Sequence, residues 1–153
     1  SILEYQQVNP RAFSGGVQIV GTDISNTMLE HCKYGHYDKL ALSRGLSAER
    51  QRQFFEMGDN GMMKVKDSVK KLVSFRHLNL LDSYSLLGRF DIVFCRNVLI
   101  YFTAETKLDI LKRMHASLNP GGYLFLGGSE ALSGLSSMFD IVQCHPGTVY
   151  KAK

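Results

Sequence analysis

Two polar residues, Arg96 and Asn97, stand where a buried strand should end. The apolar run before them, residues 92–95, is typical of a strand covered on both faces of a parallel sheet. Open α/β sheets bind ligands just beyond the carboxyl ends of their strands. The polar pair and the aromatic pair Tyr101-Phe102 are therefore candidates for the wall of a binding site. Alternatively, the polar pair only ends the strand and begins the next helix, where Asn is favoured.

Polar side chains also follow two other predicted strands. Asp23 ends the strand expected over residues 17–22, and Asn79 ends the one expected over residues 72–78. A carboxylate only accepts hydrogen bonds, so Asp23 could hold two ribose hydroxyls of a nucleotide, while the Asn79 amide could contact an adenine ring. The simpler alternatives are that Asp23 or Ser25 caps the following helix and that Asn79 forms a turn.

Composition narrows the class of protein. The chain has 153 residues, 44% of them hydrophobic, and a net charge of +4 without a single block of like charge, which suits one globular domain rather than a nucleic-acid binder. Three scattered cysteines argue against a disulfide framework and for a reducing compartment. We expect no membrane insertion and a cytoplasmic protein. The five histidines lack metal-ligand spacing, so no metal site is predicted. The basic run over residues 64–71 suits a solvated face or a docking patch.

Strand and helix patterns alternate along the chain and end in two strands joined by Pro146-Gly147. This order predicts an α/β protein with a mostly parallel sheet and an antiparallel C-terminal hairpin. The Asn60-Gly61 pair is a strong hairpin signal and predicts a small inserted antiparallel β-subdomain at about residues 50–71. An exposed edge of that hairpin could accept an added peptide strand. We expect residues 1–153 to form one domain.

Four segments carry a resemblance to a known family. FDIVFCRNVLIYF, over residues 90–102, resembles the signature of the CheR-type chemotaxis-receptor protein methyltransferases, which use S-adenosylmethionine. The same family is suggested by GTDIS at residues 21–25, HLNLLD at residues 77–82 and LNPGGYLFLGGSE at residues 118–130. The resemblance covers nearly the whole chain and implies a Rossmann-like S-adenosylmethionine-dependent methyltransferase sheet.

The resemblance implies transfer of a methyl group from S-adenosylmethionine to glutamate side chains in the cytoplasmic domain of a chemoreceptor. The products would be a glutamyl methyl ester and S-adenosylhomocysteine. A carboxylate is already ionised near neutral pH, so the protein need mainly align donor and acceptor and exclude water. In this reading Asp23 holds the ribose, Asn79 and Leu80 flank the adenine, Asn97 and Val98 border the methionine part, Tyr101 lies near the methyl group, and Arg96 lies near the acceptor carboxylate or supports the loop.

The chain departs from the family pattern at its N-terminal end. Members begin this domain with a first strand and a loop bearing a Gly-Glu-Glu-Pro-like motif, preceded by an all-helical domain, and none of these is present in the 153 residues. We therefore expect a truncated catalytic domain that lacks its first strand and is inactive by itself. Because such a sheet has unpaired edges, we also expect a dimer or a swapped element to complete it.

Two other functions compete with this one. The same fold could serve as a non-catalytic protein-interaction module, which would not bind S-adenosylhomocysteine. A nicotinamide-dependent dehydrogenase also has an acidic residue after its second strand, but the segment CRNVLIYF has no place there.

Overall fold

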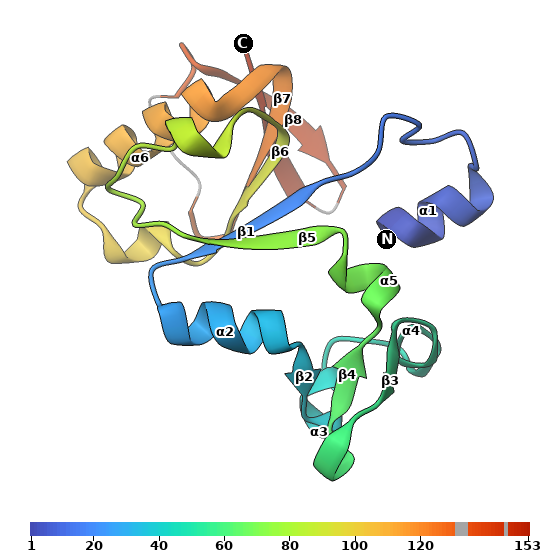
Figure 1. The fold of residues 1–153 in the computed structure, drawn as a ribbon. Helices are drawn as coiled ribbons and strands as arrows, with labels where there is room; N and C mark the ends of the chain where they lie inside the picture. The colour runs from blue at the N-terminus through green and yellow to red at the C-terminus, as the bar shows by residue number, and fades with distance from the viewer. Residues whose placement is uncertain (131–134, 146) are drawn as a thin grey trace. The chain divides into compact units, whose positions relative to one another are not determined.

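A computed structural model describes residues 1–130, 135–145 and 147–153. The chain divides into two compact units, Ser1–Asn79 and Leu80–Lys153 (Figure 1). In the part of the chain that the model describes, no helix combines the length and apolar character needed to cross a membrane.

The first unit alternates helices with short strands. In chain order its elements are α1 (Ile2–Val8), β1 (Ile19–Asp23), α2 (Asn26–Tyr34), β2 (His36–Tyr37), α3 (Lys39–Ser43), α4 (Ala48–Phe54), β3 (Phe55–Met57), the 3-10 turn η1 (Asp59–Gly61), β4 (Met63–Val65), α5 (Asp67–Lys70) and β5 (Val73–His77).

Strands β1 and β5 form a parallel pair, and they correspond to the strands predicted to end at Asp23 and Asn79. The register runs from Ile19 opposite Val73 to Asp23 opposite His77. Helix α2 runs alongside this pair (Figure 1). The sequence determines where α2 begins and ends. Ser25 caps its start by accepting a hydrogen bond from the Met28 N–H at 3.3 Å, and Gly35, in the left-handed conformation, ends it.

The small antiparallel sheet of this unit has the order β2-β4-β3. Asn60 and Gly61 both have positive φ, 54° and 74°, so the dipeptide turns the chain between β3 and β4 as its sequence indicates. The sequence pattern predicts no strand at His36 and Tyr37, where the structure has one. His36–Tyr37 forms β2, because it pairs with β4 across a distance in sequence that local patterns do not report.

Part of the basic run over residues 64–71 is tied to the backbone. Lys66 Nζ donates to the carbonyl oxygens of Arg52 and Gln53 at 2.9 and 2.8 Å. Lys70 Nζ donates to the carbonyl oxygen of Tyr34 at 3.3 Å. These two lysines therefore connect elements of the first unit, a role that neither sequence-based interpretation of the run included.

The second unit is a four-stranded sheet with one long helix. Its elements are the 3-10 turn η2 (Ser85–Leu87), β6 (Phe90–Cys95), the 3-10 turn η3 (Leu99–Tyr101), α6 (Ala104–Ser117), β7 (Leu118–Leu126), β8 (Phe139–Cys144) and β9 (Gly147–Ala152). The strand order is β6-β7-β9-β8, with β6 and β7 parallel and the other neighbours antiparallel.

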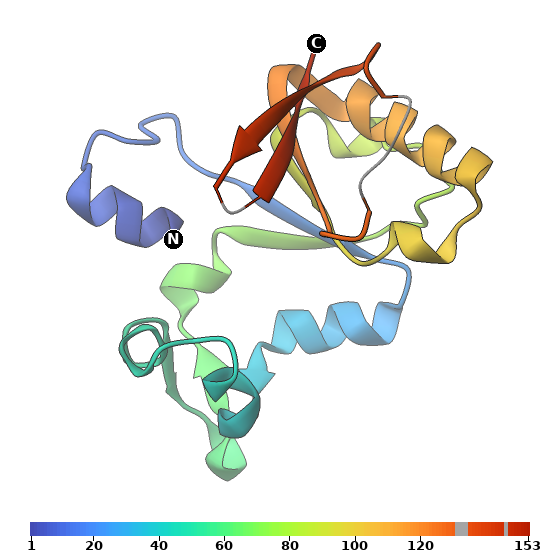
Figure 2. The same cartoon turned by 180° about the vertical axis from the view of Figure 1, so that it is seen from behind.

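Helix α6 packs against one face of this sheet, as Figure 2 shows. Its apolar side, with Ile110 and Leu111 fully buried, forms the core together with Leu124 of β7 and Phe139 of β8. Thr103 caps the helix by accepting a hydrogen bond from the Thr106 N–H.

The α/β class and the antiparallel C-terminal hairpin are confirmed, but the single mostly parallel sheet is not. The hydrogen-bonded strands fall into three sheets, one of them mixed. Among residues 1–130, 135–145 and 147–153, β1 is paired with β5 alone and β6 with β7 alone. Each unit thus contains one parallel pair: the β1–β5 pair has no further described strand, and the β6–β7 pair is extended beyond β7 by the antiparallel strand β9.

Candidate functional site

In the first unit, Asp23 and Asn79 lie at the same carboxyl edge of the parallel pair. The Leu78 N–H donates to the carbonyl oxygen of Asp23 at 3.0 Å, which carries the β1–β5 pairing one residue past β5. Asn79 is the next residue and is partly exposed. The two predicted nucleotide-binding residues of this unit therefore sit on adjacent strand ends, where open parallel sheets bind ligands.

The Asp23 side chain is exposed and only partly engaged. Its Oδ1 accepts a hydrogen bond from the Ser25 N–H at 2.8 Å. A carboxylate has two oxygens and about four acceptor positions, so this turn leaves capacity for hydroxyl groups. Both sequence-based roles are thus compatible, because Ser25 provides the helix cap and Asp23 the exposed carboxylate.

In the second unit, the segment after β6 carries Arg96, Asn97, Val98 and Tyr101 in an exposed loop. Asn97 adopts the left-handed conformation, with φ of 60°, which Asn tolerates better than most residues. Leu99 is fully buried and anchors the loop. Arg96 and Val98 are exposed, and the Tyr101 side chain is 80% exposed. The cation of Arg96, the amide of Asn97 and the phenol of Tyr101 are therefore exposed to solvent, while Leu99 anchors the loop in the core.

The buried carboxylate of Glu130 holds this loop through hydrogen bonds to its backbone. Its Oε2 accepts hydrogen bonds from the backbone N–H groups of Asn97 and Gly127, both at 2.8 Å. Its Oε1 accepts from the N–H groups of Val98 at 2.9 Å and Leu99 at 2.7 Å. The Glu130 side chain thereby joins the segments that follow the parallel strands β6 and β7.

The hydrogen bonds around Glu130 also determine its ionisation. Burial by itself would raise the pKa of this carboxyl group, but the backbone donors of Asn97, Gly127, Leu99 and Val98 outweigh burial and lower the pKa below its ordinary value. Burial raises the pKa of the neighbouring Cys95 thiol to about 11, and the charge on Glu130 adds to that increase. Glu130 is therefore ionised and Cys95 is protonated at neutral pH.

Gly127 meets a steric requirement at the same point. A Cβ atom on this residue would lie 2.5 Å from Glu130 Oε2 and 2.6 Å from Asn97 Oδ1. By contrast, a Cβ atom on the adjacent Gly128 would meet nothing within 4 Å. The first glycine of the pair is needed because the carboxylate and the Asn97 amide occupy the space of a side chain.

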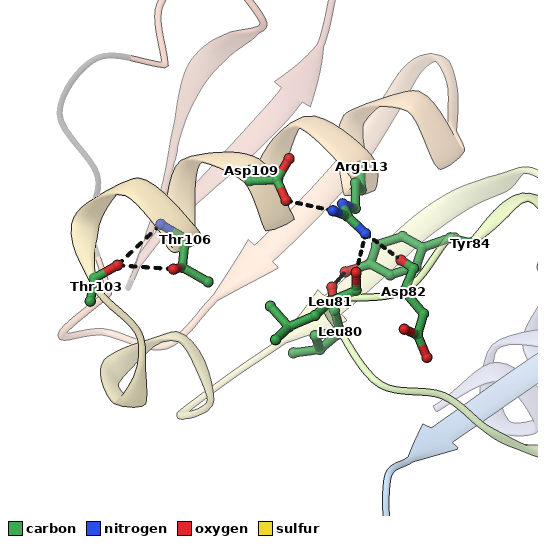
Figure 3. Close-up of polar contacts among 8 residues, drawn as sticks. All are labelled: Leu80, Leu81, Asp82, Tyr84, Thr103, Thr106, Asp109 and Arg113. Carbon is green, nitrogen blue, oxygen red and sulfur yellow. Dashed lines mark hydrogen bonds and ion pairs between the residues drawn. The ribbon is translucent and has the colours of Figure 1, made fainter.

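Leu80 is placed by hydrogen bonds at the start of the second unit. The Tyr84 hydroxyl donates to the carbonyl oxygen of Leu80 at 2.7 Å, and the Tyr84 ring is buried (Figure 3). Arg113 of α6 donates to the carbonyl oxygens of Leu81 and Asp82, as Figure 3 also shows. The segment beginning at Leu80 is thus held by its own tyrosine and by the helix.

The structure groups the predicted residues by unit. It places Asp23 beside the strand end that leads to Asn79, and it places Arg96, Asn97, Val98 and Tyr101 in one loop. Sequence reasoning assigned no role to Glu130. The available signal was an acidic residue in Gly127-Gly128-Ser129-Glu130, directly after a predicted buried strand.

Among the residues that the model describes, no group of three or more His, Cys, Asp or Glu side chains could hold a metal ion.

Comparison with known proteins identifies the family. Residues 3–148 match the model of the CheR methyltransferase SAM-binding domain. The chain is 59% identical over its full length to "Chemotaxis protein methyltransferase" of Vibrio parahaemolyticus and to "Chemotaxis protein methyltransferase 1" of Vibrio cholerae, covering 55% of each. A solved structure, PKMT2 from Rickettsia typhi, aligns with 71% of the chain and 16% of that protein at 23% identity, with a TM-score of 0.43.

The chain belongs to the family of CheR methyltransferase SAM-binding domains, as its sequence motifs indicated. It spans about half the length of the curated relatives it matches.

Proposed function

We propose that the full-length protein methylates glutamate carboxylates of a chemoreceptor cytoplasmic domain, and that this chain supplies its cofactor-binding part. The observation that carries the proposal is the position of Asn97 and Val98 in an exposed, backbone-anchored loop directly after the parallel strand β6. Family membership supports the same conclusion.

The Rossmann-like class is part of this proposal. Each unit by itself contains one parallel strand pair, and each pair has its polar candidate residues just beyond the carboxyl ends of the strands. Ligands bind at these ends in open parallel sheets.

The residues present fit S-adenosylmethionine. When bound, S-adenosylmethionine would supply an electrophilic methyl group on a sulfonium for transfer to the acceptor carboxylate, with S-adenosylhomocysteine as the leaving group. The exposed Asp23 carboxylate accepts hydrogen bonds from ribose hydroxyls with the capacity that its turn leaves free. Asn79 and Leu80 flank the adenine.

The loop after β6 orients the reacting end of the cofactor. Asn97 and Val98 border the methionine part, and the highly exposed Tyr101 lies near the transferred methyl group. Arg96 is exposed on the same loop, and its guanidinium holds the acceptor carboxylate in position. The acceptor is ionised at neutral pH, so this set needs to orient the reactants and exclude water rather than to remove a proton.

The test is methyl transfer by the full-length protein from S-adenosylmethionine with a radiolabelled methyl group to a purified chemoreceptor cytoplasmic fragment. We expect label in the fragment that mild alkali releases as methanol, because the product is an ester. A fragment whose acceptor glutamates are replaced by alanine should take up none. Absence of label, or label that resists alkali, would contradict the proposal; failure to bind S-adenosylhomocysteine would favour a non-catalytic interaction module.

A further inference from the structure

We propose that Glu130 is a positioning residue for cofactor binding: its buried carboxylate fixes the backbone of Asn97, Val98 and Leu99 in the conformation that meets the methionine part of the cofactor. The inference rests on the proposed function of this loop. It assigns Glu130 no contact with the cofactor or the substrate.

The acceptor capacity of Glu130 is fully used by the protein. Each carboxylate oxygen accepts two backbone hydrogen bonds, at distances between 2.7 and 2.9 Å. A carboxylate offers about four lone-pair positions. No position is left for a ligand hydroxyl, a metal ion or a substrate proton, so the role of this side chain must be exerted through the backbone that it holds.

The loop needs an anion at this point. Asn97 is in the left-handed and Val98 in the right-handed helical conformation, and the N–H groups of residues 97–99 all donate to one carboxylate. Successive N–H groups in such an arrangement form a concave anion-binding nest. Because Leu99 is fully buried, its N–H would be left unsatisfied without this acceptor.

Gly127 keeps the carboxylate and the loop in contact. Its N–H donates to Glu130 Oε2, and its missing side chain leaves room for that oxygen and for Asn97 Oδ1. The end of β7 therefore serves as a fixed platform for the loop after β6. A loop held before the cofactor arrives does not have to be ordered during binding, which favours affinity.

The experiment compares full-length wild type with Glu130→Gln and, as a matched control, Glu30→Gln. Gln has nearly the same shape, but its NH₂ group would face N–H donors and only one oxygen could accept. Glu30 forms an exposed ion pair with Lys33. S-adenosylhomocysteine affinity is measured by calorimetry, and hydrogen exchange of the amides of residues 97–99 is measured without ligand.

For Glu130→Gln we expect affinity to fall about ten- to hundredfold, by analogy with the loss of an outer-shell partner of a metal ligand. Amide exchange at residues 97–99 should accelerate, while affinity for the receptor fragment stays unchanged. Unchanged S-adenosylhomocysteine affinity with faster exchange would overturn the inference. A different result would contradict the proposed function itself: wild-type protein that does not bind S-adenosylhomocysteine.

A second pair of variants keeps the inference testable if Glu130→Gln does not fold. Gly127→Ala places a methyl group against the carboxylate and Asn97, whereas Gly128→Ala meets open space. We expect S-adenosylhomocysteine affinity to fall in Gly127→Ala and to remain at the wild-type value in Gly128→Ala. Equal affinities of the two variants would contradict the inference.

Discussion

The Glu130 carboxylate accepts a hydrogen bond from the Asn97 backbone N–H at 2.8 Å, across 33 residues of sequence. Through this contact and its three companions, one side chain determines the backbone that follows β6. A buried, ionised carboxylate surrounded by N–H donors is a strong acceptor, because charge-assisted hydrogen bonds are about twice as strong as neutral ones. The backbone segments that follow β6 and β7 are therefore held rigidly at the candidate site.

This contact makes local stability depend on pH in one direction. The pKa of Glu130 in the folded protein is lowered from its ordinary value of 4.5, so its ionisation stabilises the fold above that value. The contribution is lost as the pH falls through the folded-state pKa. We expect the difference in urea midpoint between wild type and Glu130→Gln to be large at pH 7 and to shrink below about pH 4.5. A difference that stays constant from pH 7 to pH 3 would show that Glu130 is not ionised in the fold.

Asp23 offers a substitution that separates binding from folding. In Asp23→Asn the amide oxygen can still accept the Ser25 N–H, so the turn at the start of α2 is kept. The second carboxylate oxygen becomes an NH₂ group, which cannot accept hydrogen bonds from the ribose hydroxyls. Hydrogen bonds to a charged group contribute roughly 1.5–3 kcal/mol, so S-adenosylhomocysteine affinity should fall about ten- to hundredfold in calorimetry.

Asp38→Asn is the matched control. Asp38 likewise accepts backbone N–H groups at a helix start, those of Leu40 and Ala41, but we assign it no role in binding. Its substitution should leave the affinity unchanged. Equal loss in both variants would mean that Asp23 acts only as a turn residue.

Tyr101 should matter for rate and not for stability. Its side chain is 80% exposed, so removing the hydroxyl in Tyr101→Phe creates no cavity and leaves the unfolding midpoint unchanged. If the hydroxyl helps to orient the methyl group, kcat falls about tenfold, the rate equivalent of one hydrogen bond of roughly 1.4 kcal/mol. Tyr5→Phe, at a ring that is 55% exposed in the first unit, should keep the wild-type kcat. A normal kcat in Tyr101→Phe would remove the hydroxyl from the proposed site.

The cysteines should differ in reactivity. Burial, assisted by the Glu130 charge, raises the pKa of Cys95 to about 11, so almost no thiolate is present at pH 8. Cys144 is exposed on β8. In iodoacetamide labelling followed by mass spectrometry, Cys144 should react first and Cys95 only after urea is added. Early modification of Cys95 in the folded protein would show that the end of β6, where the loop begins, is accessible to solvent.

Residues at strand ends could be predicted from the sequence, because a change from apolar to polar side chains is a local signal. The positions of Asp23 and Asn97 at strand ends were predicted in this way, and Ser25 begins and Gly35 ends helix α2 as their residue types indicate. Glu130 was not predicted, since three of its four partners lie 31 to 33 residues away and all four are backbone groups, which no side-chain pattern reveals. Strand β2 was missed for a similar reason: two residues have no periodicity, and β2 forms only by pairing with β4.

The most direct test of the candidate site is an amide NMR titration of the labelled full-length protein with S-adenosylhomocysteine. If the residues beyond the carboxyl ends of the parallel strands hold the cofactor, the largest shift changes will fall at residues 23–25, 79–80 and 97–99. Saturable binding whose shift changes lie elsewhere, for example on the small sheet β2-β4-β3, would contradict the account.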